Sequence, residues 1–140
     1  MDLPHMAGHL IRRLHQQSTQ VFVQRTQAAG FDLTSVQFAA LDAIHAHPGT
    51  DQARVAEMIA YDRATIGGVI DRLEQKGWIR RVVSERDRRA RELSLTPEGK
   101  RIHAALLPIV QDLQEDILQP LSQADRARFL KLARQVVRPG

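Results

Sequence analysis

The chain has 140 residues, 43% of them hydrophobic, which is ordinary for a single domain that buries a core. Because it contains no cysteine, disulfides, thiolate metal sites and thiol-based redox sensing are excluded. Basic residues outnumber acidic residues 20 to 16, and 17 of the 20 are arginines. This bias is typical of a nucleic-acid partner, and arginine usage set by a GC-rich genome is the alternative explanation.

The first part of the chain predicts two helices. Apolar residues at spacings of three and four predict a long helix that ends near Gly30. A second helix is predicted from Ser35 to about His47. Thr34 comes just before this helix and Gln37 lies in its first turn, which is the spacing of a capping box. In a capping box, the side chain of each residue accepts a hydrogen bond from the backbone N–H of the other.

The middle of the chain predicts two shorter helices separated by a tight turn. The first covers residues 51–60. Its inner side holds Val55, Met58 and Ile59. Asp62 is expected to cap the second helix, which runs to Gly77. Two adjacent glycines, Gly67 and Gly68, then fall in the middle of the second helix.

The remaining residues predict a β-hairpin and two further helices. Residues 78–83 and 91–96 are β-type segments on either side of a charged tip. Thr96 is expected to cap a long helix that runs to about Gln119, and a last helix begins at Ser122.

Two short helices joined by a tight turn and followed by a charged hairpin form a winged helix-turn-helix pattern. The predicted fold is therefore mainly α and forms one domain over residues 1–140, with residues 34–96 as the DNA-binding lobe. The long amphipathic helices in residues 1–30 and 97–140 need an apolar partner, which is either their own domain or a second copy of the chain.

The outer face of the second short helix is the face that would meet DNA. It holds Arg63, Ala64, Thr65, Gly67, Gly68, Asp71 and Arg72. A glycine inside a helix costs roughly 1 kcal/mol relative to alanine, so the glycine pair needs a reason. One explanation is that the lack of side chains at Gly67 and Gly68 lets the helix backbone approach the duplex closely. The alternative explanation is that one of these glycines permits tight packing against the neighbouring helix.

The hairpin is rich in arginine. It carries Arg80, Arg81, Arg86, Arg88, Arg89 and Arg91. A solvated charged loop is the plain explanation of such a run. A basic tip directly after a DNA-reading helix is, however, placed to reach the adjacent minor groove, where concentrated negative potential attracts arginine.

Four segments resemble the multiple-antibiotic-resistance regulator (MarR) family over practically the whole chain. They are "LTSVQFAALDAI", "VAEMIAYDRATIGGVIDRLEQKGWIRR", "SERDRRARELSLTPEGK" and the closing helix. The most specific element is "DRR" at residues 87–89, followed by "LSLTPEG". The resemblance implies a homodimeric transcription regulator, usually a repressor, that binds a pseudo-palindromic operator of double-stranded DNA. The helices of residues 1–30 and 97–140 would then form the dimer interface.

Carried over by position, the resemblance implies roles for individual helix residues. Thr65, Gly68 and Arg72 would face the major groove, with Arg63 and Ala64 near the start of the helix. Many relatives carry polar side chains where this chain has Gly67 and Gly68. This departure implies more reliance on Arg63, Thr65 and DNA shape.

The resemblance also implies roles at the tip of the hairpin. Asp87 would pair with Arg89 and orient it into the minor groove, and Arg88 would lie near a phosphate. Arg86 belongs to the same group of residues expected to contact DNA.

Members of this family commonly release DNA when a small, often aromatic and anionic molecule binds between the dimerisation helices and the DNA-binding lobe. His15 and Thr19 are one turn apart beside an apolar stripe, and Arg12 or Arg13 would neutralise a carboxylate. With Phe38, these residues are the candidates for contacts with a small aromatic carboxylate, although a histidine on such a helix is more often an interface or solvent residue.

Other functions find little support. The sequence shows no nucleophile elbow, phosphate loop, zinc-hydrolase or dinucleotide motif, so we expect neither an enzyme nor a cofactor. His5 and His9 lack an acidic or cysteine partner, so no metal site is expected. No apolar stretch is long enough to cross a bilayer, and we expect a cytoplasmic protein. The alternative function is a dimeric helical protein-interaction adaptor with the same fold but no operator binding.

Overall fold

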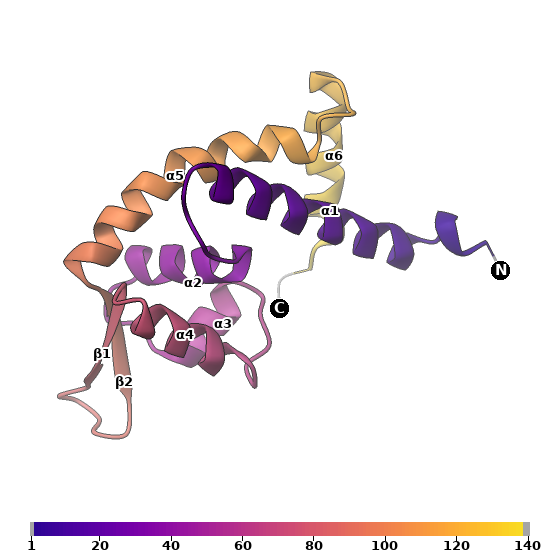
Figure 1. Ribbon diagram of the computed structural model, residues 1–140. Coiled ribbons are helices and arrows are strands. Elements are labelled where there is room, and N and C mark those ends of the chain that lie inside the picture. Colours follow the sequence, from indigo (N-terminus) through magenta and orange to yellow (C-terminus); the bar gives the residue numbers. More distant parts are fainter. Residues whose placement is uncertain (1, 139–140) are drawn as a thin grey trace.

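The structure is a computed structural model that describes residues 2–138. Its elements in chain order are η1 (Leu3–His5), α1 (Ala7–Ala28), α2 (Ser35–Ala46), α3 (Gln52–Met58), α4 (Ile66–Gln75), β1 (Ile79–Val83), β2 (Arg91–Leu95), α5 (Pro97–Ile117) and α6 (Gln123–Val136). Figure 1 shows a lobe formed by α2, α3, α4 and the β1–β2 hairpin, with α1 and α5 lying side by side next to it. This arrangement confirms the predicted winged helix-turn-helix fold. Between residues 2 and 138, no helix combines the length and the hydropathy needed to cross a bilayer.

Side-chain caps fix where several helices begin. Thr34 Oγ1 accepts a hydrogen bond from the backbone N–H of Gln37, and Gln37 Oε1 accepts one from the N–H of Thr34, each at 3.1 Å. This is the predicted capping box at the start of α2. The hydroxyls of Thr96 and Ser122 accept from N–H groups three residues further on and open α5 and α6. The predicted starts of all three helices are confirmed.

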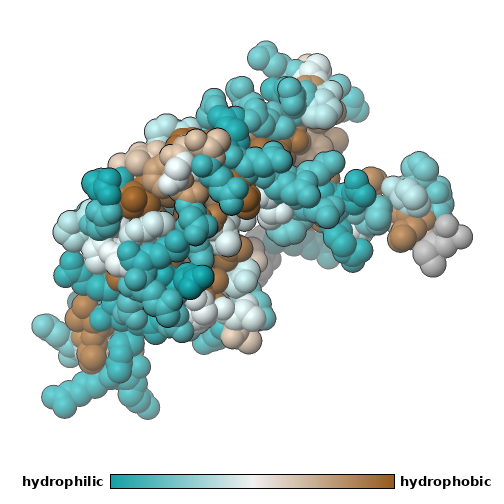
Figure 2. All heavy atoms as spheres, in the orientation of Figure 1, coloured by the Kyte–Doolittle hydropathy of each residue, from teal (hydrophilic) through white to brown (hydrophobic). Residues whose placement is uncertain are grey.

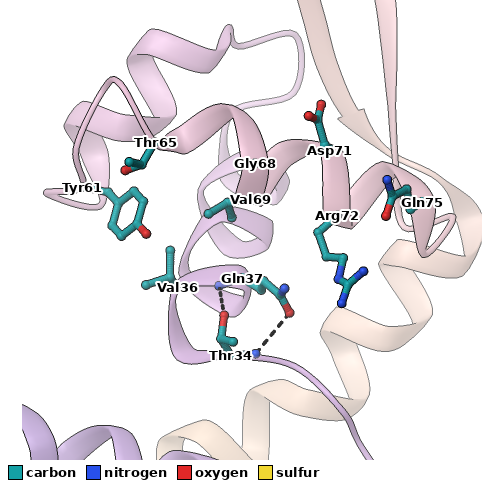
Figure 3. Close-up of a pocket in the computed structure, with 10 residues that line it drawn as sticks. All are labelled: Thr34, Val36, Gln37, Tyr61, Thr65, Gly68, Val69, Asp71, Arg72 and Gln75. Atoms are coloured by element: carbon teal, nitrogen blue, oxygen red, sulfur yellow. Dashed lines mark hydrogen bonds between the residues drawn. The ribbon is translucent and has the colours of Figure 1, made fainter.

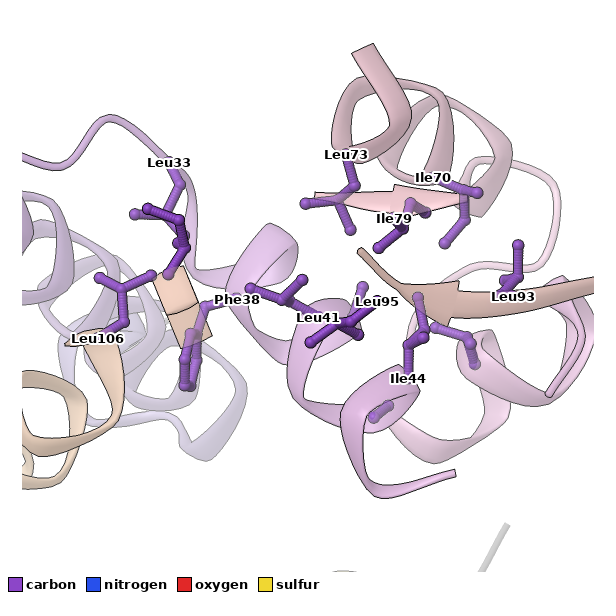
Figure 4. Packing of buried hydrophobic residues seen from close by; sticks show 14 of the residues in the cluster. Leu33, Phe38, Leu41, Ile44, Ile70, Leu73, Ile79, Leu93, Leu95 and Leu106 are labelled. Carbon is purple, nitrogen blue, oxygen red and sulfur yellow. The ribbon is translucent and has the colours of Figure 1, made fainter. Parts of the chain in front are cut away.

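The hydrophobic core lies where α2 meets α4, the hairpin and α5 (Figure 4). Leu41 and Ile44 of α2, Ile70 of α4 and Leu106 of α5 are 0% exposed, and Leu95 of β2 is 7% exposed. Burying a side chain of this size contributes about 1.5–3 kcal/mol. Because the core fixes the inner face of α4, it also determines which face of α4 points outward.

Helix α4 is shorter than predicted. The Asp62 side chain does accept a hydrogen bond from the N–H of Ala64, at 3.1 Å, but the helix begins only at Ile66. An aspartate that bonds to the N–H two residues on closes a turn of its own, and this turn delays the helix. Gly67 and Gly68 therefore lie in the first turn of α4, and their expected position in its middle is wrong.

Helix α3 also ends before the predicted point. Val55 is fully buried as expected, but Met58 is 42% exposed, so its expected place on the inner side is wrong. The physical reason is that the helix stops at Met58 and the chain turns away through Ala60, whose φ of 55° is left-handed.

Helix α5 approaches the base of the hairpin closely. A Cβ atom added at Gly99 would lie 1.9 Å from the carbonyl oxygen of Trp78, so only glycine fits at this position. The N–H of Thr96 donates a hydrogen bond to the same carbonyl at 3.0 Å. The two-stranded antiparallel sheet is therefore fixed to the start of α5.

The terminal helices leave much apolar surface uncovered. Ile11 of α1 is 60% exposed and Val136 of α6 is 70% exposed. Helix α6 has no buried residue. Helix α1 is tied to α5 by Arg25, which forms ion pairs with Asp112 and Asp116.

Candidate nucleic-acid interface

The outer face of α4 is the first part of the candidate interface. Thr65 at its N-cap and Gly68 and Arg72 within it are exposed and follow one another at spacings of three and four, so they share one side of the helix (Figure 3). Arg63 and Ala64 are exposed in the turn that precedes α4. Because the opposite side of α4 is buried in the core, this exposed side is the one a large partner can reach.

This face borders a hollow of about 660 Å³ between α4 and the start of α2 (Figure 3). Its lining includes six residues that the sequence did not place at the interface: Thr34, Val36, Gln37, Tyr61, Val69 and Gln75. Thr34 and Gln37 were assigned only to the capping box. Val36 is partly exposed and Tyr61 is exposed, and no sequence pattern had singled out either of them. The candidate interface thus extends from α4 onto α2.

The two adjacent glycines have different surroundings. A Cβ atom at Gly67 would lie 3.3 Å from Nε2 of Gln52 on α3, whereas one at Gly68 would meet nothing within 4 Å. The position of Gly67 thus favours the alternative of packing against the neighbouring helix, and its contact with DNA stays a prediction. Gly68 is exposed and leaves the helix backbone open to a close approach.

The tip of the hairpin is the second part of the candidate interface. Arg86, Arg88 and Arg89 are exposed, and hydrophilic side chains project from the hairpin in Figure 2. Asp87 Oδ1 accepts a hydrogen bond from the N–H of Arg89 at 3.0 Å and lies 3.7 Å from its Nε atom, so the expected pair is present. The buried hydroxyl of Ser84 accepts from the N–H groups of Arg86 and Asp87, which shapes the turn.

Arg81 does not belong to the basic tip. Its guanidinium donates a hydrogen bond to Asp71 on α4, and its Nε atom lies 3.7 Å from Glu74 Oε1. The alternation of a strand places Arg81 on the same face as buried Ile79 and turns Arg80 to the opposite face. Of the six hairpin arginines, Arg81 therefore turns toward α4 and not toward the tip.

Known proteins are similar to this chain over almost its whole length. A family model described as the MarR family matches residues 33–90. The transcriptional regulator HosA of Escherichia coli O157:H7 is 35% identical over 137 residues, which is 98% of this chain and 98% of HosA. The chain belongs to the MarR family. The HTH-type transcriptional repressor NicR of Pseudomonas putida is 32% identical over 97% of this chain and 85% of NicR.

Solved structures of regulators share the MarR-family fold seen here. The PcaV regulator of Streptomyces coelicolor, in complex with its natural ligand, has 36% identity and a TM-score of 0.85 over 97% of this chain and 94% of its own. The repressor CouR, bound to a 23-mer DNA duplex, has 28% identity and a TM-score of 0.85 over 98% and 96%. BpsR of Bordetella bronchiseptica, whose DNA binding is regulated by 6-hydroxynicotinic acid, has 27% identity and a TM-score of 0.86 over 96% and 95%. This MarR-family chain is accordingly a DNA-binding transcriptional regulator.

The residues expected to bind a small effector of this MarR-family regulator are not gathered around one cavity. Arg12 and His15 are exposed on α1. Thr19 is partly buried, and its hydroxyl donates to the carbonyl of Gln16 at 2.9 Å. Phe38 is 7% exposed. None of the four candidates lines the hollow between α2 and α4. For metals, no group of three or more His, Asp or Glu side chains within residues 2–138 is placed to hold an ion.

Phe38 belongs instead to an aromatic cluster that joins α2 to α5. Its ring stacks on that of His103 with centroids 5.8 Å apart and lies 6.3 Å from the ring of Phe22. His103 is 3% exposed, and its Nε2 atom lies 2.8 Å from Oδ1 of Asp42. The sequence pattern did not single out His103, although its position three residues before Leu106 on the apolar stripe of α5 was a usable signal. The cluster fixes the lobe to α5.

Proposed function

We propose that this MarR-family chain is a homodimeric repressor that binds a pseudo-palindromic operator and releases it when a small aromatic carboxylate binds. One observation carries the DNA-binding part. The exposed side of α4 and the arginine-tipped hairpin belong to one packed lobe, so their relative position is set before DNA arrives. A winged helix-turn-helix places such a helix in the major groove, with the hairpin near the adjacent minor groove. The CouR structure, with its DNA duplex, supports the same use of the fold.

The proposed base-reading residues lie on and before α4. Thr65, Gly68 and Arg72 face the major groove, and Arg63 and Ala64 lie near the start of the helix. Arg72 is suited to a bidentate contact with guanine, which contributes about 1–3 kcal/mol of discrimination. Gly67 is not included, because it faces α3.

The proposed contacts of the hairpin are electrostatic. Arg89 enters the minor groove and is held by Asp87, while Arg86 and Arg88 lie near phosphates. The carboxylate of Asp87 faces the Arg89 backbone and guanidinium, so it restricts the side chain that must reach into the groove.

The dimer is proposed from the terminal helices. Leu10 and Ile11 of α1 are 47% and 60% exposed, and Leu130 and Val136 of α6 are 46% and 70% exposed. Apolar surface of this kind marks an interaction site. A symmetric pair would place its two α4 helices in successive major grooves about 34 Å apart, which corresponds to half-sites about 10 base pairs apart. Footprinting that shows one unsymmetric half-site would contradict this arrangement.

The effector is proposed from α1 and from the chemistry of the relatives. The ligand that regulates BpsR is an aromatic carboxylic acid, as the name 6-hydroxynicotinic acid states. Arg12 would neutralise such a carboxylate, with His15 and Thr19 one turn apart beside it. Phe38 would not touch the ligand in this conformation, because its ring is buried.

A bound effector weakens DNA binding only if it favours a dimer whose lobes are spaced differently from those of the DNA-bound dimer. Thermal-shift screening of small aromatic acids, followed by DNA displacement with each hit, tests this part of the proposal. Acids that stabilise the protein without displacing DNA would contradict it.

Salt dependence separates the operator-binding function from a protein-interaction adaptor. If the dimer neutralises about 6 to 10 phosphates, its affinity for duplex DNA should fall by about three to five decades between about 50 and 200 mM salt. Fluorescence anisotropy with a labelled operator measures this directly. A flat response would favour the adaptor.

Arg89→Ala tests the role of the hairpin. We expect operator affinity to fall at least about tenfold while dimerisation is unchanged, because the variant removes a groove contact and nothing at the terminal helices. Lys100→Ala is the matched control, since it removes one exposed positive charge from α5. An Arg89→Ala protein that binds its operator as tightly as the wild type would show that the hairpin assignment is wrong.

A further inference from the structure

Helix α4 carries two carboxylates on the side that faces the hairpin. Asp71 and Glu74 are three residues apart and share one face, with side chains 59% and 46% exposed. Asp71 also lines the hollow that contains Gly68 and Arg72. A DNA strand that approaches Arg72 therefore comes near the negative charge of Asp71, and uncompensated like charges across an interface disfavour binding.

Arg81 of β1 supplies the compensating charge. Its guanidinium is hydrogen-bonded to Asp71 and lies beside Glu74. The side chain is 26% exposed, whereas that of Arg89 at the hairpin tip is 96% exposed. Its Nε atom is buried and forms no hydrogen bond with any described residue. A partly buried cation of this kind depends on nearby carboxylates for its stability.

We infer that Arg81 is a positioning residue for DNA binding, which fixes the hairpin to α4 and offsets the negative charge of Asp71, the carboxylate that lies nearest to Arg72 in sequence, beside the duplex. The inference rests on the proposed DNA-binding function. It assigns two opposite roles to neighbouring arginines of one strand. Arg80 faces outward and is free to meet phosphate, whereas Arg81 faces α4 and acts through the recognition helix.

A double-mutant cycle on operator affinity tests the inference. Arg81→Gln should weaken binding about tenfold, because Asp71 then faces the DNA uncompensated. Adding Asp71→Asn should recover most of the lost affinity, because the negative charge beside the DNA is removed. Arg80→Gln is the matched control on the same strand, and adding Asp71→Asn to it should change affinity by no more than about twofold.

Thermal unfolding of the same variants separates this role from a purely structural one. Arg81→Gln should lower the unfolding temperature. The unfolding temperature of the Arg81→Gln/Asp71→Asn protein should stay equally low, because the ion pair is still missing. DNA affinity should therefore recover without recovery of stability. If Arg81→Gln does not fold, Arg81→Lys should show a smaller loss with the same rescue, because one ammonium group cannot pair with both carboxylates as the guanidinium does.

Two results would overturn the inference. One is a double variant that binds the operator as weakly as Arg81→Gln, which would mean that Arg81 contacts DNA itself or acts only on stability. The other is an equal rescue of Arg80→Gln by Asp71→Asn, which would reduce the effect to net charge. A wild-type protein that binds no duplex DNA would instead overturn the proposed function, and the inference with it.

Discussion

The lobe from α2 to β2 and the terminal helices α1 and α6 differ in how far their large apolar side chains are exposed. Leu41, Ile44 and Ile70 in the lobe are 0% exposed, whereas Ile11 of α1 is 60% and Val136 of α6 is 70% exposed. Because exposed apolar surface is unfavourable in water, the exposed residues of α1 and α6 are the ones that a second copy of the chain would cover. The proposed dimer therefore rests on the terminal helices, and the proposed DNA contacts rest on the lobe, whose core is buried within this chain.

The largest effect on stability is expected where the start of α5 meets the hairpin of the lobe. Gly99→Ala would place a Cβ atom 1.9 Å from a backbone oxygen of Trp78, so the start of α5 must separate from the hairpin. We expect a loss of more than about 4 kcal/mol in the free energy of unfolding, measured with urea. Gly8→Ala is the matched control, because a Cβ atom there meets nothing within 4 Å and should stabilise α1 by up to about 1 kcal/mol. A Gly99→Ala protein as stable as the wild type would contradict the claim that only glycine fits beside Trp78.

The second prediction compares one isoleucine from each part. Ile70→Ala leaves a cavity in the core of the lobe and should cost about 2–5 kcal/mol of stability. Ile11→Ala should change the stability of the single chain by less than about 0.5 kcal/mol but weaken self-association, because its side chain is exposed until a partner covers it. Chemical unfolding and dilution experiments by analytical ultracentrifugation measure the two quantities. Unchanged self-association in Ile11→Ala would count against α1 as an interface.

The smallest effect is expected from an exposed ion pair on α5. The hydrogen bond from Arg101 lowers the pKa of Glu98 below its ordinary value of 4.5. A lowered pKa means that the charged pair stabilises the fold above the ordinary value and that this contribution is lost as the pH falls through the lowered pKa. The small stability difference between the wild type and Glu98→Gln should therefore shrink below about pH 4. A difference that stays constant down to pH 2 would contradict the role of this pair.

Features set by neighbouring residues could be predicted from the sequence. Thr34, Thr96 and Ser122 each cap a helix through a residue three positions away, so the pattern contains all the information that the contact needs. The buried stripe of α4 followed in the same way from helical periodicity, as Ile66 and Ile70 confirm.

Features that depend on distant residues could not be predicted. The pair of Arg81 with Asp71 spans two elements, and a charge-rich hairpin does not reveal which arginine turns toward α4. Gly99 is small because of Trp78, which belongs to another element. The predicted start of α4 was wrong for a different reason. Asp62 has equally good local chemistry for capping a helix and for closing a turn, so the local sequence does not decide between them.

The central claim is that two copies of the chain, joined by their terminal helices, place two lobes on one duplex. Native mass spectrometry of the protein with a duplex that carries its operator tests this most directly. The account predicts two chains for each duplex at low protein concentration, with no populated complex of one chain. A stable complex of one chain with one duplex, or two chains that hold no DNA, would contradict it.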